Sequence, residues 1–503
     1  MYLDIFHKLF LVNFSMRLLI LIFSVGAVFF SCSLSSDADV ESSDISISIS
    51  APNNQAIVSD SVLIDLEIGD DSMISKVELW VNNDSTGIQD LNPPFSILWN
   101  TKDYKNSSYD IFVRSYDMQG KKFDSGTITI TISNFLVFSK TFGSNEKSEL
   151  GRSIIQTIDS GFVMLGEVDN DILLMKSNRY GDMEWQQSFG GSQTDIASHI
   201  EQASDGGFII SATTESYGQG GKDIWLFKTS SSGLIEWNKY IGTPYDDYSG
   251  QVLETEDGGF IVIGSKGSSD QNDNDIWLIK TNSQGDSSWT RSYGGSQFDR
   301  GNDILADDQG GFILLGSTES QGNGGKDIWL LKVDENGNDQ WNNTYGNGSD
   351  DIGQSMIRTL DGGFLIRYLI ESYGEGNTSV GLLRLGPNRQ ELWTKTVGGS
   401  MGITGRGFQK VSDDEYMMSC SLFDNGKNSY NAYIIKIGDS GDIIWDKIFG
   451  GEENDRARSI VQTLDGGYAI AGSTCNYGNG NKLDPDLWLI KTDSEGYSRS
   501  FDD

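Results

Sequence analysis

Apolar and polar residues alternate with a period of two along most of the chain from residue 45 onward. Segments such as SVLIDLEI (61–68), SKVELWV (75–81) and GTITITIS (126–133) place every second side chain on the same face. This is the pattern of half-buried β-strands. Turn residues, including Asn82-Asn83-Asp84 and Pro93-Pro94, separate the segments. The pattern predicts an all-β protein.

Residues 45–134 contain several such strands in about ninety residues, which predicts a small β-sandwich. Trp80 and Trp99 are predicted to lie in its core, which packing alone must stabilise because no cysteine pair bridges the sheets. The runs VELWVNN, PPFSILWNT and YDIFVRSYDMQG resemble bacterial immunoglobulin-like domains of surface proteins. The resemblance implies a spacer or an adhesion module, of which we favour the spacer.

Residues 135–503 are built from repeats. Six tryptophans recur 52 residues apart: Trp185, Trp237, Trp289, Trp341, Trp393 and Trp445. Each repeat also carries D-G-G-[FY], a Gly-rich loop and a D-I-W-L-x-K strand, and each contains four short strands. A unit of four short strands cannot bury both of its faces alone, so this pattern predicts the blade of a β-propeller.

The two ends of the repeat region are complementary. Residues 138–143 copy the start of the pattern, with Phe138 in the tryptophan position, whereas the last repeat ends without a tryptophan. The strand at 135–143 should therefore complete the blade begun by residues 452–493, which removes the open edge. The fold class predicted is all-β, a seven-bladed β-propeller preceded by a small immunoglobulin-like β-sandwich. An eighth blade would need a repeat that the sequence lacks.

The tandem DGGF, GST and DxWLxK motifs of residues 138–496 resemble repeats of bacterial surface proteins. The G-x-x-x-W element resembles quinoprotein-type propellers, and the overall architecture is also kelch-like. No partner set for a quinone cofactor is visible and quinoproteins usually have eight blades. A quinone-dependent oxidoreductase is therefore the least supported interpretation.

The N-terminus resembles a lipoprotein signal. An apolar run over residues 17–31 ends in Ser31 directly before Cys32. The resemblance implies a signal peptide over 1–31, lipidation of Cys32 and a flexible acidic tether over 32–44, with Met1 or Met16 as the start. It predicts an outer-membrane lipoprotein held on the membrane by its lipid anchor. The acidic stretch resembles a surface-export sequence or is a plain spacer, so exposure at the cell surface is expected but a periplasmic position stays open.

Composition limits the function. The net charge is −35 and the pI about 4.3, which excludes a nucleic-acid partner. Three cysteines cannot form a disulfide framework; Cys420 and Cys475 are predicted to be free thiols, with a disulfide as the alternative. His7 and His199 are the only histidines, which argues against a zinc site and most catalytic triads. We therefore expect no enzyme and no cofactor.

A bound calcium ion is the alternative to the absence of a cofactor, because two loops are rich in oxygen ligands. These loops contain Asp334, Asn336 and Asp339, and Asp270, Asp273 and Asp275. Neither has the full spacing with a distal glutamate, so ordinary turns are the favoured interpretation. Acids also recur at one position before the first strand of most repeats: Glu149, Asp195, Asp247, Asp299, Asp351 and Asp455. Turn capping is favoured there over a cation site.

Function is better sought where the repeats differ. Arg152, Arg406 and Arg458 occupy one position in blades that closure makes neighbours, and could bind a carboxylate, a sulfate or an acidic sugar. Pairing with nearby acids is the alternative. Tyr217, Tyr373 and Tyr477 lie in Gly-rich loops predicted to be on the same face, where they could stack on sugars or contact a protein. Packing against a neighbouring blade is their alternative.

These features predict a non-enzymatic surface lipoprotein that binds a partner, or acts as a scaffold, through one propeller face. The partner is an unidentified surface protein or glycan. The alternative is a glycan-binding or glycan-active propeller for polysaccharide capture, and the fold alone does not decide between them.

Overall fold

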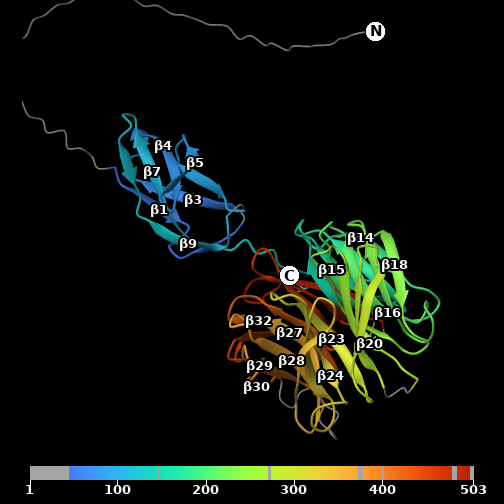
Figure 1. Ribbon diagram of the computed structural model, residues 1–503. Helices are drawn as coiled ribbons and strands as arrows, with labels where there is room; N and C mark the ends of the chain where they lie inside the picture. The colour runs from blue at the N-terminus through green and yellow to red at the C-terminus, as the bar shows by residue number, and fades with distance from the viewer. Residues whose placement is uncertain are drawn as a thin grey trace, which may run out of the picture.

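A computed structural model describes residues 45–59, 61–102, 104–144, 147–269, 273–371, 378–397, 402–478 and 484–498. These residues form two β domains (Figure 1), which confirms the predicted all-β fold. Their one helix is a 3-10 turn, Asp71–Met73, and no described segment forms a helix long and apolar enough to cross a membrane. The predicted signal peptide, Cys32 and tether lie outside the described residues, as does Tyr373.

The N-terminal domain is a sandwich of two sheets. One sheet contains β1 (Ile47–Ala51), β3 (Ser61–Ile68) and β6 (Ser96–Asn100). The other contains β2 (Ile57–Val58), β9 (Ile128–Ile132), β7 (Ser107–Asp117), β4 (Ile74–Val81) and β5 (Asp84–Asp90), with β8 (Lys122–Asp124) on β7. Side chains from both sheets, including Ile64, Leu79, Trp99 and Ile111, are fully buried between them.

Trp99 is a core residue as predicted, but the prediction for Trp80 was wrong. Leu79 and Val81 on β4 point into the sandwich, so the period of two turns Trp80 to the outer face. There its ring stacks on Phe112 at 5.7 Å and the Arg114 guanidinium lies 4.3 Å from its centroid. The alternation of β4 contained this information, and the size of the tryptophan concealed it.

The remaining strands form seven four-stranded antiparallel sheets in the described part of residues 138–492, which we call blades one to seven. Blades one to three are β11 (Glu149–Gln156), β12 (Phe162–Val168), β13 (Asp171–Ser177) and β14 (Met183–Phe189); β15 (Asp195–Gln202), β16 (Phe208–Thr214), β17 (Asp223–Thr229) and β18 (Ile235–Ile241); and β19 (Tyr248–Glu254), β20 (Phe260–Lys266), β21 (Asp275–Thr281) and β22 (Ser287–Tyr293). Blades four to six are β23 (Asp299–Ala306), β24 (Phe312–Thr318), β25 (Asp327–Val333) and β26 (Asp339–Tyr345); β27 (Asp350–Arg358), β28 (Phe364–Glu371), β29 (Thr378–Leu385) and β30 (Glu391–Val397); and β31 (Ile403–Lys410), β32 (Glu415–Asp424), β33 (Ser429–Gly438) and β34 (Ile443–Phe449).

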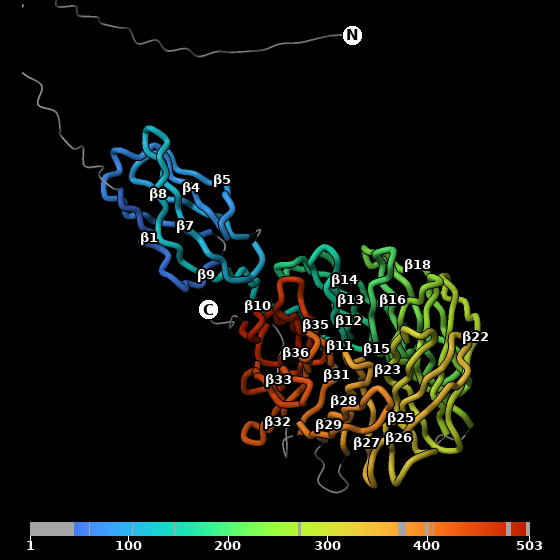
Figure 2. The backbone as a smooth tube through the Cα atoms, turned by 60° about the vertical axis from the view of Figure 1, so that its left-hand side comes forward, coloured from blue at the N-terminus to red at the C-terminus, as the bar shows by residue number. Residues whose placement is uncertain are grey.

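Blade seven joins the two ends of the propeller. It contains β35 (Asp455–Gln462), β36 (Tyr468–Thr474), β37 (Asp486–Thr492) and, as its outer strand, β10 (Phe138–Phe142). Phe138 pairs with Lys491 as Trp185 pairs with Lys176 in blade one. Figure 2 shows β10 where the chain enters the propeller, beside the C-terminal strands. The first strands of successive blades contact one another around the ring, and β35 contacts β11.

The repeated motifs act within and between blades. Lys228 of the D-I-W-L-x-K strand lies 2.8 Å from both carboxylate oxygens of Asp205 in the D-G-G turn. Corresponding pairs are Lys176–Asp159, Lys280–Asp257, Lys332–Asp307, Lys491–Asp465 and Arg384–Asp361. Trp185 packs on Gly233 of the next blade, whose φ is +79° and where a Cβ would lie 2.5 Å from the ring. The motifs therefore stabilise the fold, and repetition alone does not mark a ligand site.

Candidate functional site

The predicted arginines lie at β-bulges of neighbouring inner strands. The register shifts at Arg152 in β11 and at Arg458 in β35, and the shift in β31 includes Arg406. Arg152 forms a bidentate ion pair with Glu167 of β12, with N–O distances of 3.0 and 2.8 Å. Arg458 is partly buried, and the side chain of Arg406 lies outside the described part. Arg152 is thus paired with a nearby acid, the alternative to anion binding. Binding of an anion by the three arginines stays a prediction.

Sequence reasoning missed a ring of polar side chains that follows the bulges. Gln251 accepts a hydrogen bond from the Ile304 N–H at 3.0 Å, and Asp303 accepts one from the Met356 N–H at 2.7 Å. His199 also bonds to the main chain of Val252, and because this bond favours the protonated imidazole, the ring donates to the carbonyl group. Gln251 and Asp303 each satisfy a main-chain N–H in the next blade, beside the place where the bulge interrupts that strand's pairing, and His199 contacts the main chain at the corresponding position. The 52-residue spacing was the signal that could have found this ring.

Two members of this ring have strongly shifted pKa values. Burial lowers the pKa of His199 to about 4, because the charged imidazolium is poorly solvated there. Burial raises the pKa of Asp303 to about 7, although two main-chain N–H groups bind its carboxylate. Both shifts follow from a structural role, so they do not by themselves mark a catalytic site.

The predicted tyrosines pack over junctions between blades. Tyr217 donates a hydrogen bond to the Gly190 carbonyl at 2.7 Å and stacks on Tyr240 with a centroid distance of 4.8 Å. Tyr477 donates to the Gly450 carbonyl at 3.1 Å and lies 5.6 Å from Trp488. The packing alternative thus describes both residues, which cover the junction with the preceding blade.

The recurring acids cap turns. Asp195 accepts hydrogen bonds from the Gly191 N–H at 3.0 Å and the Ser216 hydroxyl at 2.8 Å. Asp299 and Asp455 bind corresponding groups in their own blades. In the oxygen-rich loop that contains Asp334, one oxygen of Asp334 accepts from the N–H groups of residues 336 and 338, which is the favoured turn chemistry. No cluster of three or more His, Cys, Asp or Glu able to hold a metal occurs among the described residues. Cys420 and Cys475 are free thiols.

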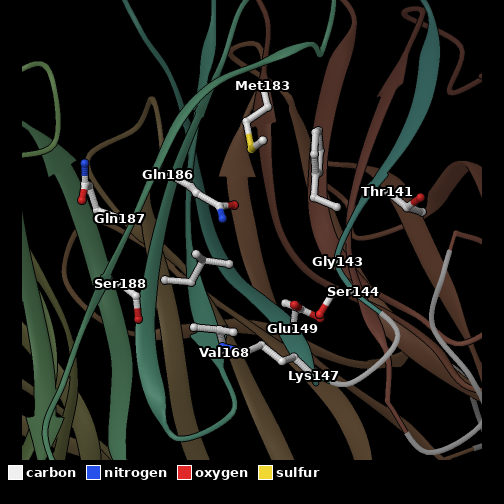
Figure 3. A pocket seen from close by; sticks show the side chains of 12 residues that line it. Thr141, Gly143, Ser144, Lys147, Glu149, Val168, Met183, Gln186, Gln187 and Ser188 are labelled. Carbon is white, nitrogen blue, oxygen red and sulfur yellow. The ribbon is translucent and has the colours of Figure 1, made fainter.

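A pocket of about 560 Å³ lies at the junction between blades seven and one. Its walls come from β10 and the turn after it, and from β13 and β14 (Figure 3). Phe142, Val168, Leu173 and Met183 provide apolar surface. Gln186, Gln187 and Ser188 provide polar groups, and Lys147 and Glu149 the charged ones. The volume suits a small molecule or a sugar unit.

Two departures from the repeat account for this pocket. Leu173 occupies the place that Trp225 fills in blade two, where Trp225 packs against Tyr217 and Tyr240. In addition, β12 ends at residue 168 and β13 begins at 171, so blade one lacks the loop that carries Tyr217 in blade two. Both large side chains that fill the junction between blades one and two are therefore absent here.

Glu149 provides the pocket's titratable carboxyl group. Burial and the nearby Asp486 raise the pKa of Glu149 to about 7, and Lys147 opposes this shift. One of its oxygens, Oε2, has no hydrogen-bond partner among the described residues. Asp486 is buried and does not line the pocket. The pocket thus presents a single acid that changes charge near neutral pH.

The comparisons with known proteins agree with this two-domain, all-β class. A family model described as a bacterial Ig domain matches residues 46–113. Such sandwiches are common in cell-surface and extracellular proteins. No curated protein matches the chain.

The solved structures that match the chain share little sequence with it. Virginiamycin B lyase from Staphylococcus aureus is 14% identical and has a TM-score of 0.42, covering 70% of this chain and 99% of its own. The β-propeller domain of the trilobed protease from Pyrococcus furiosus is 12% identical and has a TM-score of 0.39, covering 73% and 100%. Fibronectin(III)-like modules of Clostridium thermocellum CbhA are 14% identical and have a TM-score of 0.16, covering 17% and 93%.

Proposed function

We propose that this chain is a non-enzymatic binding protein of the bacterial cell surface, whose ligand occupies the pocket between blades seven and one. The observation that carries the proposal is the pair of departures in blade one, which leave this junction open beside Glu149. The immunoglobulin-like domain separates the propeller from the membrane, to which a lipid on Cys32 attaches the chain. Replacing Cys32 by Ala should move the protein from the membrane to the soluble fraction; a membrane-bound variant would contradict the anchor.

The pocket's chemistry favours a neutral, hydroxyl-rich ligand such as a glycan unit. Phe142 and Leu173 offer apolar surface for the face of a sugar ring, and Gln186 and Gln187 offer amide donors and acceptors. Ionised Glu149 accepts strong hydrogen bonds from hydroxyl groups. Binding should therefore strengthen as the pH rises through about 7, the pKa of Glu149.

A glycan-active propeller is the second candidate. Glycoside hydrolysis requires two carboxyl groups that flank the bond to be broken. Glu149 lines the pocket, whereas Asp486 is buried behind Gly143. This arrangement favours binding over hydrolysis, although Glu149 has the raised pKa that a general acid needs.

The test is a glycan and surface-protein array probed with the purified mature chain at pH 6 and pH 8. We expect a glycan ligand that binds more tightly at pH 8, and a Glu149→Gln variant that binds it equally at both values. Release of cleaved product would establish the glycan-active alternative. A ligand lost on Arg458→Ala but retained by Glu149→Gln would place binding at the arginine positions instead.

A further inference from the structure

Carboxylates from neighbouring strands approach the glycine that follows the outer strand at several of the described blade junctions. At the junction of blades three and four, Asp275 begins β21 and Asp299 begins β23. A Cβ on Gly294 would overlap Asp275 and lie 2.8 Å from an oxygen of Asp299. The Asp299 N–H also donates to the Asn274 carbonyl at 2.6 Å, which fixes the two strands side by side. Related pairs are Asp171–Asp195 at Gly190 and Asp327–Asp351 at Gly346.

The pair between blades three and four is incompletely bonded. Asp299 is fully buried, and its Oδ2 accepts hydrogen bonds from the Gly295 N–H at 2.9 Å and the Ser320 hydroxyl at 2.8 Å. Its Oδ1 and the Oδ1 of Asp275 have no partner in the described part of the chain. Nor does any described lysine or arginine form an ion pair with either residue, although Lys266 is close enough to influence Asp275. Two neighbouring carboxylates that each hold one buried oxygen without a donor are costly unless a cation or a proton binds them.

We infer that Asp275 and Asp299 bind one divalent cation of the calcium class, which ties the third strand of blade three to the first strand of blade four. Hard cations prefer carboxylate oxygens. The pair supplies two ligands, so main-chain carbonyls and water complete the six to eight oxygens that Ca²⁺ takes. Asp275 also belongs to one of the oxygen-rich loops noted in the sequence, but its partner here is Asp299 of the next blade and not a residue of that loop. The site is independent of the proposed ligand pocket.

The junction between blades six and seven provides an internal control. Asn431 takes the place of the first aspartate there. Asp455, which corresponds to Asp299, is fully bonded. Its Oδ1 accepts from the Thr474 hydroxyl at 2.5 Å, and its Oδ2 from the Gly451 N–H at 2.8 Å and the Asn476 amide at 2.6 Å. We therefore expect no cation at this junction.

The experiment compares the full chain with Asp275→Asn in Ca²⁺ and in EDTA at pH 7, by urea unfolding and by calorimetric Ca²⁺ titration. The variant should bind one Ca²⁺ fewer per chain. At a free Ca²⁺ concentration about a hundred times Kd, an occupied site lowers the unfolding constant about 100-fold. The variant loses this factor in Ca²⁺, but in EDTA it should be more stable than the wild type because two like charges no longer oppose each other.

A control variant and a second readout separate the cation site from a general loss of stability. Asp455→Asn should lose stability equally in both buffers and leave the Ca²⁺ stoichiometry unchanged. Terbium luminescence excited through Trp277, two residues from Asp275, provides a second readout on the wild type alone. A wild type that binds no Ca²⁺ or Tb³⁺, with Asp275→Asn more stable in both buffers, would overturn the inference and indicate a shared proton. An unchanged stoichiometry in Asp275→Asn would overturn it as well.

Discussion

His199 allows the role of the inner ring to be tested through the pH dependence of stability. The pKa of His199 is about 4 in the folded chain, against about 6.5 for an unperturbed histidine. Between these two values the unfolded chain binds a proton that the folded chain does not. Stability therefore falls as the pH drops from about 6.5 to 4, by roughly 3 kcal/mol in all and about 2 kcal/mol at pH 5.

The perturbation is His199→Gln. Gln251 shows that a neutral amide fits the next position of the ring, where its oxygen accepts the Ile304 N–H. The amide N–H of the glutamine can likewise donate to the Val252 carbonyl, so the variant should match the wild type near pH 7.5. It should exceed the wild type by about 2 kcal/mol at pH 5. His199→Ala is the control, since it leaves the Val252 carbonyl without the imidazole donor and should lose about 1–3 kcal/mol at both values.

Urea unfolding followed by tryptophan fluorescence at pH 5, 6 and 7.5 measures these differences. The opposing titration of Asp303 is common to both proteins, so it cancels when they are compared. Parallel pH profiles for the wild type and His199→Gln would refute the reasoning, because they would mean that His199 is solvated and carries a proton in the folded chain.

Three other changes have defined outcomes. Asp303→Asn keeps an acceptor for the Met356 N–H. Because the pKa of Asp303 is about 7, the wild type loses stability as the pH rises from about 4 to 7. In urea unfolding at pH 8 the variant should therefore be more stable, by as much as about 4 kcal/mol. An equal pH dependence in both proteins would contradict this. Lys228→Met removes a buried ammonium group from Asp205 and should lose about 1–2 kcal/mol by thermal unfolding. Lys239, whose side chain is partly exposed, is the comparison, and Lys239→Met should change little. A chain beginning at residue 135 should fold. A chain beginning at residue 143 lacks β10 and the buried Phe138, so calorimetry should show it to be less stable by at least about 3 kcal/mol. Equal stability of the two chains would count against ring closure through β10.

Much of the fold could be predicted because the repeat makes one set of local rules apply many times. The 52-residue spacing of the tryptophans and the D-G-G turns indicated four-stranded units, and Phe138 in the tryptophan position indicated the closing strand. Trp80 shows the limit of this reasoning. Its size suggested burial, but the alternation along β4 determined its face.

The candidate site was harder to predict, because the repeated residues that attract attention act in packing. Tyr217 fills a junction, and Arg152 is paired with Glu167 in the strand beside it. The pocket depends on what blade one lacks. Its third strand reads DILLMK where blade two reads DIWLFK, and its short turn replaces a Tyr-bearing loop. Both departures are visible in the sequence, but only the structure brings them together beside Glu149.

The central claim is that the open junction between blades seven and one is the ligand site, and Leu173→Trp tests it most directly. The substitution restores the side chain that fills the junction between blades one and two, and burying the larger side chain should stabilise the propeller by about 1–2 kcal/mol. Trp225→Leu is the matched control, since it removes the corresponding side chain at a junction without Glu149. We would measure the affinity of both variants for the array ligand by titration calorimetry. We expect at least a tenfold loss of affinity in a folded Leu173→Trp and none in Trp225→Leu. Unchanged affinity in Leu173→Trp would contradict it.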